Sequence, residues 1–390
     1  MSIIYMDNAA TTPVHPDVLQ KALPYFTDAF GNPNSVHSEG RKARGAIERA
    51  RQQCAAVLNC TSEQLFFCGS ATEADNWAVQ MHHEYLDQWS SPNNKILYSS
   101  IEHKAILNSV DKEFDVSIPV DENGIVDVDF IKSACLDIAN DKITVCVMWA
   151  NNEVGSIQPI KELSDFCYRH RIPLHVDAVQ YAGKGRIDLS RMRGITSLAI
   201  SGHKTQGMKG AALLFLRDPK APHVKPFIKG GGQERGLRSG TENVPAIVAL
   251  GFAMTKFPKD NEFHNAHVTE MHKLLQCALS EIPETRFNGD CEYQLPHYLN
   301  VSFKGIEGES LVHALDRRGI CVSAGSACNS GSLEPSYVLK AIGVPDDYIN
   351  GTIRVSLSEN NTLEECEVVA KAIKEEVAKL REVSPTWKGE

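Results

Sequence analysis

Short apolar runs alternate with longer amphipathic segments over roughly the first two thirds of the chain. Between Glu39 and Asn59, apolar residues recur at steps of three and four, which predicts a helix with a basic outer face. The apolar runs are expected to be buried strands: Leu65–Cys68, Ile96–Ser99, Ile143–Trp149, Leu174–Val176, Leu198–Ile200 and Ala211–Leu216. This alternation predicts an α/β fold with a mainly parallel sheet covered by helices on both faces.

The pattern changes after about Phe257. The elements expected there are a polar helix at Glu262–Ile282, short strands near Tyr298–Phe303 and Cys321–Ser323, and a final helix at Leu363–Arg381. They predict a smaller α+β domain. We expect the large domain to span residues 16–257 and the small domain to combine residues 1–15 with 258–390.

The composition is that of an ordinary folded enzyme, with 390 residues, 42% of them hydrophobic and 23% charged. The formal net charge of −9 argues against a protein whose main task is to grip nucleic acid or an anionic membrane, because those surfaces attract basic faces. We therefore expect no direct nucleic-acid contact and no membrane contact. No apolar segment is long enough to span a bilayer.

The 11 cysteines are scattered, and no two form a Cys-x-x-Cys pair. A structural zinc site is therefore not expected, and no metal site is predicted. The N-terminus lacks a basic start, and its apolar stretch stops at Asp7, so we expect no signal peptide. Free thiols in this number are typical of the reducing cytoplasm, which is the location we predict.

The strongest chemical signal is Ser201-Gly202-His203-Lys204, directly after an apolar strand run. The preceding apolar strand ends on Asp177, 27 residues before Lys204, which leaves room for one strand–helix–strand step. An amine and an acid at neighbouring strand ends suit pyridoxal phosphate (PLP), since the lysine can bind the aldehyde and the acid can keep the ring nitrogen protonated. Taken alone, Asp177 would more often cap a helix and Lys204 would more often be a surface lysine.

Two segments are candidates for anion binding. In Gly69–Glu73 a strand turns through glycine into a helix, and backbone amides at a helix N-terminus bind phosphate well. The spacing of Ser70 and Glu73 equally fits a simple capping box, and both interpretations can hold together. The glycine-rich stretch Gly230–Thr241 fails as a dinucleotide motif, but its two arginines and its threonine suit an anion, including one bound in a neighbouring subunit.

Nine segments along the chain together match one known family. They are Tyr5–Thr12, Gly31–Ser35, Gly69–Glu73, Glu102–Lys104, Asn151–Gly155, His175–Asp177, Ser201–Lys204, Arg238–Asn243 and Ser323–Cys328. Through them the chain resembles, over nearly its whole length, the PLP-dependent cysteine desulfurases of the NifS/IscS type, which are related to class-V aminotransferases. The resemblance implies PLP-dependent transferase fold type I, with a mainly parallel seven-stranded sheet covered by helices and a smaller α+β domain.

The resemblance also implies roles for individual residues. Lys204 would hold PLP and move protons, Asp177 would pair with the pyridine nitrogen, and His103 would stack on the ring. The remaining cofactor residues would be Gln180 at the phenolic oxygen, Ala71, Thr72, Ser201 and His203 at the phosphate, and Thr241 from the other subunit of a homodimer. Arg354 and Asn152 would bind the substrate carboxylate, and Asn152 would also contact the cofactor. Without the resemblance, His103 would be read as a core histidine, Asn152 as a turn residue and Arg354 as part of a surface ion pair.

Cys328 distinguishes this family from other PLP enzymes. Its neighbours at 323–332 are small and polar, which predicts an exposed and mobile loop in the small domain. The implied reaction begins when L-cysteine displaces Lys204 from PLP. The Cys328 thiolate then attacks the substrate sulfur, which leaves an enzyme persulfide and L-alanine. Either His103 or Lys204 would carry the protons.

Other functions stay open at this stage. An aminotransferase, a β-lyase or a selenocysteine lyase would share Lys204 and Asp177 but would need no loop thiol. A non-enzymatic protein of this fold would be expected to have lost one of those two residues. The sulfur acceptor, expected to be a protein, could serve iron–sulfur clusters, tRNA thiolation or the sulfur modification of DNA.

Near Lys204, Met208 stands where the family commonly has proline, and Gly202 where alanine is frequent.

Overall fold

The computed structural model describes residues 3–88, 94–136, 142–256, 262–289, 291–324, 335–385 and 387. Its largest element is a seven-stranded sheet in the order β2-β8-β7-β6-β5-β3-β4. The strands are β2 (Leu65–Cys68), β3 (Lys95–Ser99), β4 (Val116–Ile118), β5 (Ile143–Cys146), β6 (Leu174–Asp177), β7 (Ile195–Ser201) and β8 (Ala212–Leu216). From β4 to β7 the neighbouring strands are parallel, and β8 runs antiparallel to both β7 and β2. The predicted mainly parallel sheet is confirmed.

Two details of the strand prediction need correction. The strand expected at Ile143–Trp149 ends at Cys146, because the last residue of β3 to pair with it is Tyr98. Beyond that point Val147 and Trp149 still donate backbone hydrogen bonds to β6, but they have no strand on the other side. The sequence analysis also missed the edge strand β4, whose three residues carry only a weak apolar signal.

Helices cover both faces of the sheet. On one face lie α3 (Ser38–Leu58), α6 (Val128–Leu136), α7 (Ile160–His170) and α8 (Val244–Thr255), whose buried side chains join one large core. On the other face lies α4 (Ala71–Leu86), which packs through the fully buried Trp77. The short helix α5 (Lys104–Leu107) continues this layer. The helix expected at Glu39–Asn59 is α3, which ends at Asn59 in a left-handed cap.

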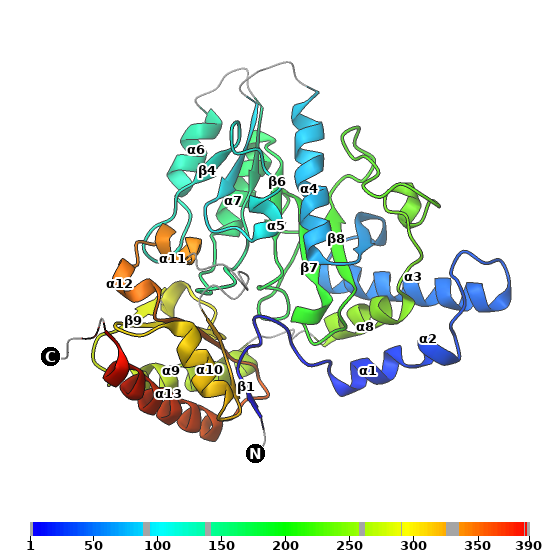
Figure 1. Ribbon diagram of the computed structural model, residues 1–390. Helices are drawn as coiled ribbons and strands as arrows, with labels where there is room; N and C mark the ends of the chain where they lie inside the picture. The colour runs from blue at the N-terminus through cyan, green and yellow to red at the C-terminus, as the bar shows by residue number, and fades with distance from the viewer. Residues whose placement is uncertain are drawn as a thin grey trace.

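A second sheet, in the order β12-β13-β10-β9, lies below the first in Figure 1. Its strands are β9 (Thr285–Asn288), β10 (Tyr298–Phe303), β12 (Ser323–Ala324) and β13 (Thr352–Ser356), all antiparallel. The helices α9 (Glu262–Leu279), α10 (Gly308–Asp316) and α13 (Leu363–Val383) share a core with it. The predicted strand at Cys321–Ser323 is in fact split between β11 (Ile320–Cys321) and β12, and the sequence analysis missed β9 and β13.

The N-terminal segment connects the two parts. Strand β1 (Ile4–Tyr5) pairs in parallel with β11, and Asp7 bridges to Ser356. The chain then passes to the short helices α1 (Pro16–Ala22) and α2 (Pro24–Thr27), which lie beside α8 at the lower right of Figure 1. Two further short helices, α11 (Tyr337–Ala341) and α12 (Asp346–Ile349), lie between the second sheet and the β4–α6 region. The domain limits given above stay a prediction.

Three findings apply to the described residues alone. No helix among them is both long and apolar enough to cross a membrane. They contain no cluster of histidine, cysteine and acidic side chains that could hold a metal ion. Nine of the described cysteines have free thiols: Cys54, Cys60, Cys68, Cys135, Cys146, Cys167, Cys277, Cys321 and Cys366.

Candidate active site

The carboxyl ends of five strands meet at one edge of the large sheet. Strands β3, β5, β6 and β7 are parallel, so the residues that follow them, including His103, Asn152, Asp177 and Lys204, emerge at the same edge. Strand β2 joins them because both β2 and β7 are antiparallel to β8. Cys68 and Ser201 therefore flank Ala212 from either side. This register places the Gly69 turn and the Lys204 turn two strands apart, about 10 Å.

Lys204 ends the one-turn 3₁₀ helix at Gly202–Lys204 that follows β7. Its ammonium donates hydrogen bonds to the carbonyl oxygens of Ala9 and Ala10, the latter at 2.7 Å. A cavity of about 370 Å³ borders this side chain, with Asn8, Lys184, His297 and Glu359 among its walls. The N-terminal segment thus holds the amine at the sheet edge, and the cavity leaves it room to change direction.

Asp177 is the last residue of β6 and is 4% exposed. Burial is the main reason that its pKa rises from 3.8 to about 7, and the nearby carboxyl of Asp75 raises it further. Asp75 contacts His175 Nε2 at 3.2 Å, and His175 Nδ1 contacts the hydroxyl of Ser197 at 2.9 Å. A buried acid without a cation is costly, so a protonated ring nitrogen would be a favourable partner for Asp177.

His103 follows β3 as the N-cap of α5, where its Nδ1 accepts a hydrogen bond from the Ala105 amide at 3.1 Å. Burial is the main cause that lowers its pKa; the Asp177 carboxyl partly raises it again, and Lys204 lowers it further, so the ring is mostly neutral at neutral pH and able to accept a proton. Gln180 is buried near the same edge. Its amide nitrogen donates to Ala9 O at 3.2 Å, and its side-chain oxygen accepts from the Tyr298 hydroxyl.

The turn that leads into α4 is built to present backbone amides. Ser70 is the N-cap of α4, and its hydroxyl accepts from the Glu73 amide at 3.1 Å. The Glu73 carboxylate accepts from the Gly69 amide at 2.9 Å, one residue earlier than a regular capping box would place it. The amides of Ala71 and Thr72 open the helix, so backbone donors are available at the predicted phosphate position. His203 lies on the neighbouring turn, with Nδ1 3.1 Å from the Thr11 hydroxyl.

The glycine-rich stretch is anchored to the large sheet through Glu234. Glu234 is 6% exposed and forms a paired contact with both terminal nitrogens of Arg51, each at 2.8 Å. Glu234 also accepts from the Phe67 amide of β2 at 2.9 Å. Thr241 lies further along this loop and is exposed, as a residue that reaches a neighbouring subunit would have to be.

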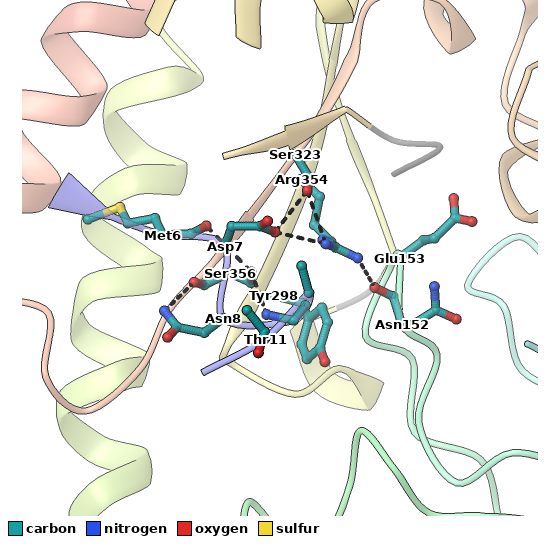
Figure 2. A network of polar contacts seen from close by, with 12 residues as sticks. Met6, Asp7, Asn8, Thr11, Asn152, Glu153, Tyr298, Ser323, Arg354 and Ser356 are labelled. Carbon is teal, nitrogen blue, oxygen red and sulfur yellow. Dashed lines mark hydrogen bonds and ion pairs between the residues drawn. The ribbon is translucent and has the colours of Figure 1, made fainter. Parts of the chain in front are cut away.

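Arg354 lies on β13 and is 3% exposed, so its alternative interpretation as part of a surface ion pair is wrong. Figure 2 shows its guanidinium between Asp7 and Asn152. It lies 2.9 Å from the Asp7 carboxylate, 2.7 Å from the Asn152 carbonyl and 3.3 Å from the Ser323 hydroxyl. Its Nε and the side-chain oxygen of Asn152 are buried, and neither has a hydrogen-bond partner among the described residues. Unpaired buried polar atoms of this kind are costly and suit a ligand that would satisfy them.

The predicted site residues thus divide by position. Residues at the sheet edge come from β3, β5, β6, β7 and the turn after β2, whereas Arg354 comes from the second sheet. Cys328 lies outside the described residues, and Ser323 and Ala324 are the last described before it. The buried acid Asp177, the amides opening α4 and the unpaired atoms of Asn152 and Arg354 all fit PLP and an amino-acid substrate.

The sequence analysis missed several residues that hold this site. Asp7 and Ser323 fall within the family motifs but received no role, and both contact Arg354. Tyr298 bonds to Gln180 from a strand whose apolar pattern concealed its hydroxyl. Arg238 pairs with Glu73 across 165 residues of sequence. Long-range pairs such as these leave no periodic signal in a single sequence, so only the motif residues could have been found.

Comparison with known proteins agrees with this geometry. The family description "Aminotransferase class-V" matches residues 4–369. The cysteine desulfurase IscS of Methanosarcina thermophila is 41% identical over 388 residues, which cover 98% of this chain and 94% of that protein. Among solved structures, a NifS-like protein has a TM-score of 0.87 and 34% identity, with 97% of this chain and 100% of the other covered. A structure described as SspA in complex with cysteine has a TM-score of 0.78 and 34% identity, with 91% and 99% covered.

Proposed function

Since the chain belongs to the class-V aminotransferase family, we propose that it is a PLP-dependent cysteine desulfurase, which removes sulfur from L-cysteine and leaves L-alanine. The observation that carries this proposal is the meeting of Lys204, Asp177 and His103 at one sheet edge, with a buried Arg354 facing that edge from the second sheet. PLP supplies an electron sink for carbanion chemistry when it is bound.

Each residue has a role that its surroundings support. Lys204 binds the cofactor aldehyde, and Asp177 keeps the pyridine nitrogen protonated through its buried carboxylate. The amides of Ala71 and Thr72, with Ser201 and His203, bind the phosphate. Gln180 would donate a hydrogen bond to the phenolic oxygen, and His103, whose pKa is lowered by burial, would stack on the ring and accept a proton in its neutral form.

Arg354 and Asn152 bind the substrate carboxylate. The guanidinium is held in one orientation by Asp7 and the Asn152 carbonyl, while its Nε has no hydrogen-bond partner among the described residues. A directional donor fixed in this way suits a carboxylate better than a lysine would. This grip would orient the Cβ–S bond of L-cysteine with respect to the sheet edge.

We propose Cys328 as the residue that takes the sulfur. Its thiolate attacks the sulfur of L-cysteine, the bond between that sulfur and Cβ breaks, and the electron pair returns to Cβ, which takes up a proton. L-cysteine and the enzyme thiol thus become L-alanine and an enzyme persulfide, and no external oxidant or reductant is needed. Cysteines such as Cys54 and Cys135 are poorer candidates, because burial raises the pKa of both thiols to about 12.

The finer statements on partners are also proposals. We propose a homodimer in which Thr241 of each subunit completes the phosphate site of the other, and this is supported by its position on an exposed, firmly anchored loop. The acceptor of the persulfide sulfur would be another protein, and the cytoplasm is the compartment that the free cysteines favour.

The test is the mass of the peptide that contains Cys328. The purified, PLP-loaded protein is mixed with L-cysteine in the absence of reductant, and L-alanine is quantified in parallel. We expect one additional sulfur atom on Cys328 and formation of L-alanine. A Lys204→Ala variant should give neither, because it cannot hold the cofactor at its aldehyde.

Cys328→Ala is the matched control for the sulfur transfer. It should retain the absorbance of the bound cofactor but lose nearly all desulfurase turnover. Full activity of Cys328→Ala with an unmodified thiol in the wild type would contradict the persulfide step. That result would favour a β-lyase or an aminotransferase on the same fold.

A further inference from the structure

A carboxylate lies at the turn that presents amides to the phosphate. Glu73 accepts a hydrogen bond from the Gly69 amide at 2.9 Å, while its own amide donates to Ser70 at 3.1 Å. Its side chain is 16% exposed, so solvent screens its charge only in part. Glu73 therefore places a negative charge within two residues of the amides of Ala71 and Thr72, where a phosphate group would bind.

Arg238 neutralises that carboxylate. Its Nε lies 2.6 Å from Glu73 Oε1, and its Nη2 lies 3.0 Å from Oε2, which is a paired, directional contact. The guanidinium also lies directly over the turn, since a Cβ built on Gly69 would be 3.5 Å from Nη2. Arg238 comes from the glycine-rich loop, three residues before Thr241. Two candidate phosphate elements thus meet at this ion pair.

Two anions at one helix N-terminus repel each other, and the phosphate of PLP would be the second. We propose that Arg238 is a positioning residue for the phosphate site that acts through Glu73. It cancels the charge of the capping carboxylate, so that the N-terminus of α4 can accept a dianion while Glu73 still holds the Gly69 turn in shape. This inference rests on the proposed PLP dependence.

A purely mechanical role makes a different prediction. If Arg238 only fastened the glycine-rich loop to the turn, then loss of the ion pair from either side would do equal harm. Under charge compensation, the two sides are not equivalent. Loss of Arg238 leaves a bare carboxylate beside the phosphate, whereas loss of the Glu73 charge removes the repulsion itself.

The experiment measures cofactor affinity for the full-length apoprotein, prepared by removal of PLP with hydroxylamine. Arg238→Met, Glu73→Gln and the double variant are titrated with PLP, and the absorbance of the cofactor on Lys204 is recorded. The same proteins are titrated with pyridoxal, which lacks the phosphate. Gln at position 73 keeps an oxygen that can accept from the Gly69 amide, so the turn is preserved.

We expect Arg238→Met to weaken PLP binding on the order of tenfold, from repulsion at close range. Glu73→Gln should bind PLP at least as tightly as the wild type, and the double variant should recover the affinity that Arg238→Met loses. Binding of pyridoxal should be the same in all four proteins. Arg238→Lys, which keeps the charge but not the paired contact, should fall between Arg238→Met and the wild type.

The opposite pattern would overturn the inference. A double variant as weak as Arg238→Met, or a Glu73→Gln protein that binds PLP poorly, would show that Arg238 acts mechanically or by direct contact. If Arg238→Met does not fold, Glu73→Gln alone decides, because the two roles predict opposite changes for it. A wild-type apoprotein that fails to take up PLP at all would overturn the proposed function itself, and this inference with it.

Discussion

At the scale of single residues, the site is distinguished by acids kept away from water. Asp177, Asp75 and Glu153 are each no more than 5% exposed. Burial is the main cause that raises their pKa values, to about 7, about 8 and about 7. Groups with strongly shifted pKa values tend to gather at functional sites, because a buried ionisable group lowers stability and is kept where its chemistry is used. Asp177 is the member of this group to which the proposed function assigns a cationic partner.

Asp177→Asn should therefore separate stability from activity. In the apoprotein, Asp177 has a pKa of about 7 against an ordinary value of 3.8, so its neutral form contributes stability below pH 4 that is lost as the pH rises toward 7. Asparagine carries no charge and can still accept from the Val179 amide. We expect apo Asp177→Asn to be more stable than the apo wild type by about 1 kcal/mol or more at pH 8, and not at pH 4. Thermal denaturation of both apoproteins across this range measures the difference.

The same variant should lose most of its desulfurase turnover, because an amide does not keep the ring nitrogen protonated. In the PLP-loaded form its stability advantage should disappear, since the wild-type carboxylate then has its partner. An apo variant that is less stable than the wild type at pH 8 would show that Asp177 is already compensated by the protein alone.

The sequence identified some of the individual site residues directly and others only through family resemblance. Lys204 and Asp177 could be named because their chemistry is read together with the strand ends beside them, whereas His103 was named only through family resemblance. Arg354 was named only through family resemblance, because a single arginine in an apolar run has the same pattern whether it is exposed or buried. Glu73 was assigned a cap, but its partner Arg238 is distant in sequence, and no local pattern connects the two.

At the scale of elements, the central strands of the large sheet could be predicted because both of their faces are buried, which makes their sequences continuously apolar. The strands of the second sheet gave weaker signals. Strand β13 carries Arg354 and Ser356, and β9 carries Arg286 and Asn288, so polar residues interrupt both. The glycine-rich loop was the least predictable element, because its order depends on the contact between Glu234 and Arg51.

That loop is held against its own backbone preference. Glu234 and Arg235 both have positive φ angles, of 45° and 59°, which is unfavourable for residues with side chains. Arg51→Met should leave the buried Glu234 carboxylate without its guanidinium and lower the free energy of unfolding by about 3–5 kcal/mol. Urea denaturation of the PLP-free protein measures this loss.

The matched control is an ion pair on the surface. Lys161 and Asp165 lie 3.3 Å apart on α7, with side chains 83% and 53% exposed. Lys161→Met should change the unfolding free energy by less than about 1 kcal/mol. Equal effects of the two substitutions would mean that the Arg51 contact does not hold the loop.

At the scale of the whole molecule, the N-terminal segment joins the two sheets around the site. Asp7 contacts Arg354 of the second sheet, while the carbonyls of Ala9 and Ala10 accept from Lys204 of the first. Tyr298 adds a further link through Gln180. The sequence could place these residues in motifs but not in space, because contacts between residues 7 and 354 depend on the assembled fold.

If Thr241 completes the phosphate site of a partner subunit, two inactive variants should restore one another. Lys204→Ala lacks the amine, and Thr241→Ala lacks the phosphate contact that it lends to its neighbour. In a mixed dimer, the site with an intact Lys204 receives Thr241 from the other chain. Random pairing makes half of the dimers mixed, each with one complete site of two, so coexpression should give about a quarter of wild-type activity at limiting PLP.

The control pairs Lys204→Ala with Asp177→Asn, two residues at the ends of neighbouring strands in one chain. Every site in that mixture lacks one of the two groups, so no activity should return. Restoration in the first mixture alone would require a site shared between subunits, because neither chain supplies a complete one. If the first mixture regains no activity, or if sedimentation velocity shows a monomer, then Thr241 acts only within its own chain. The anchored loop would then serve the Glu73 turn beside it and no neighbour.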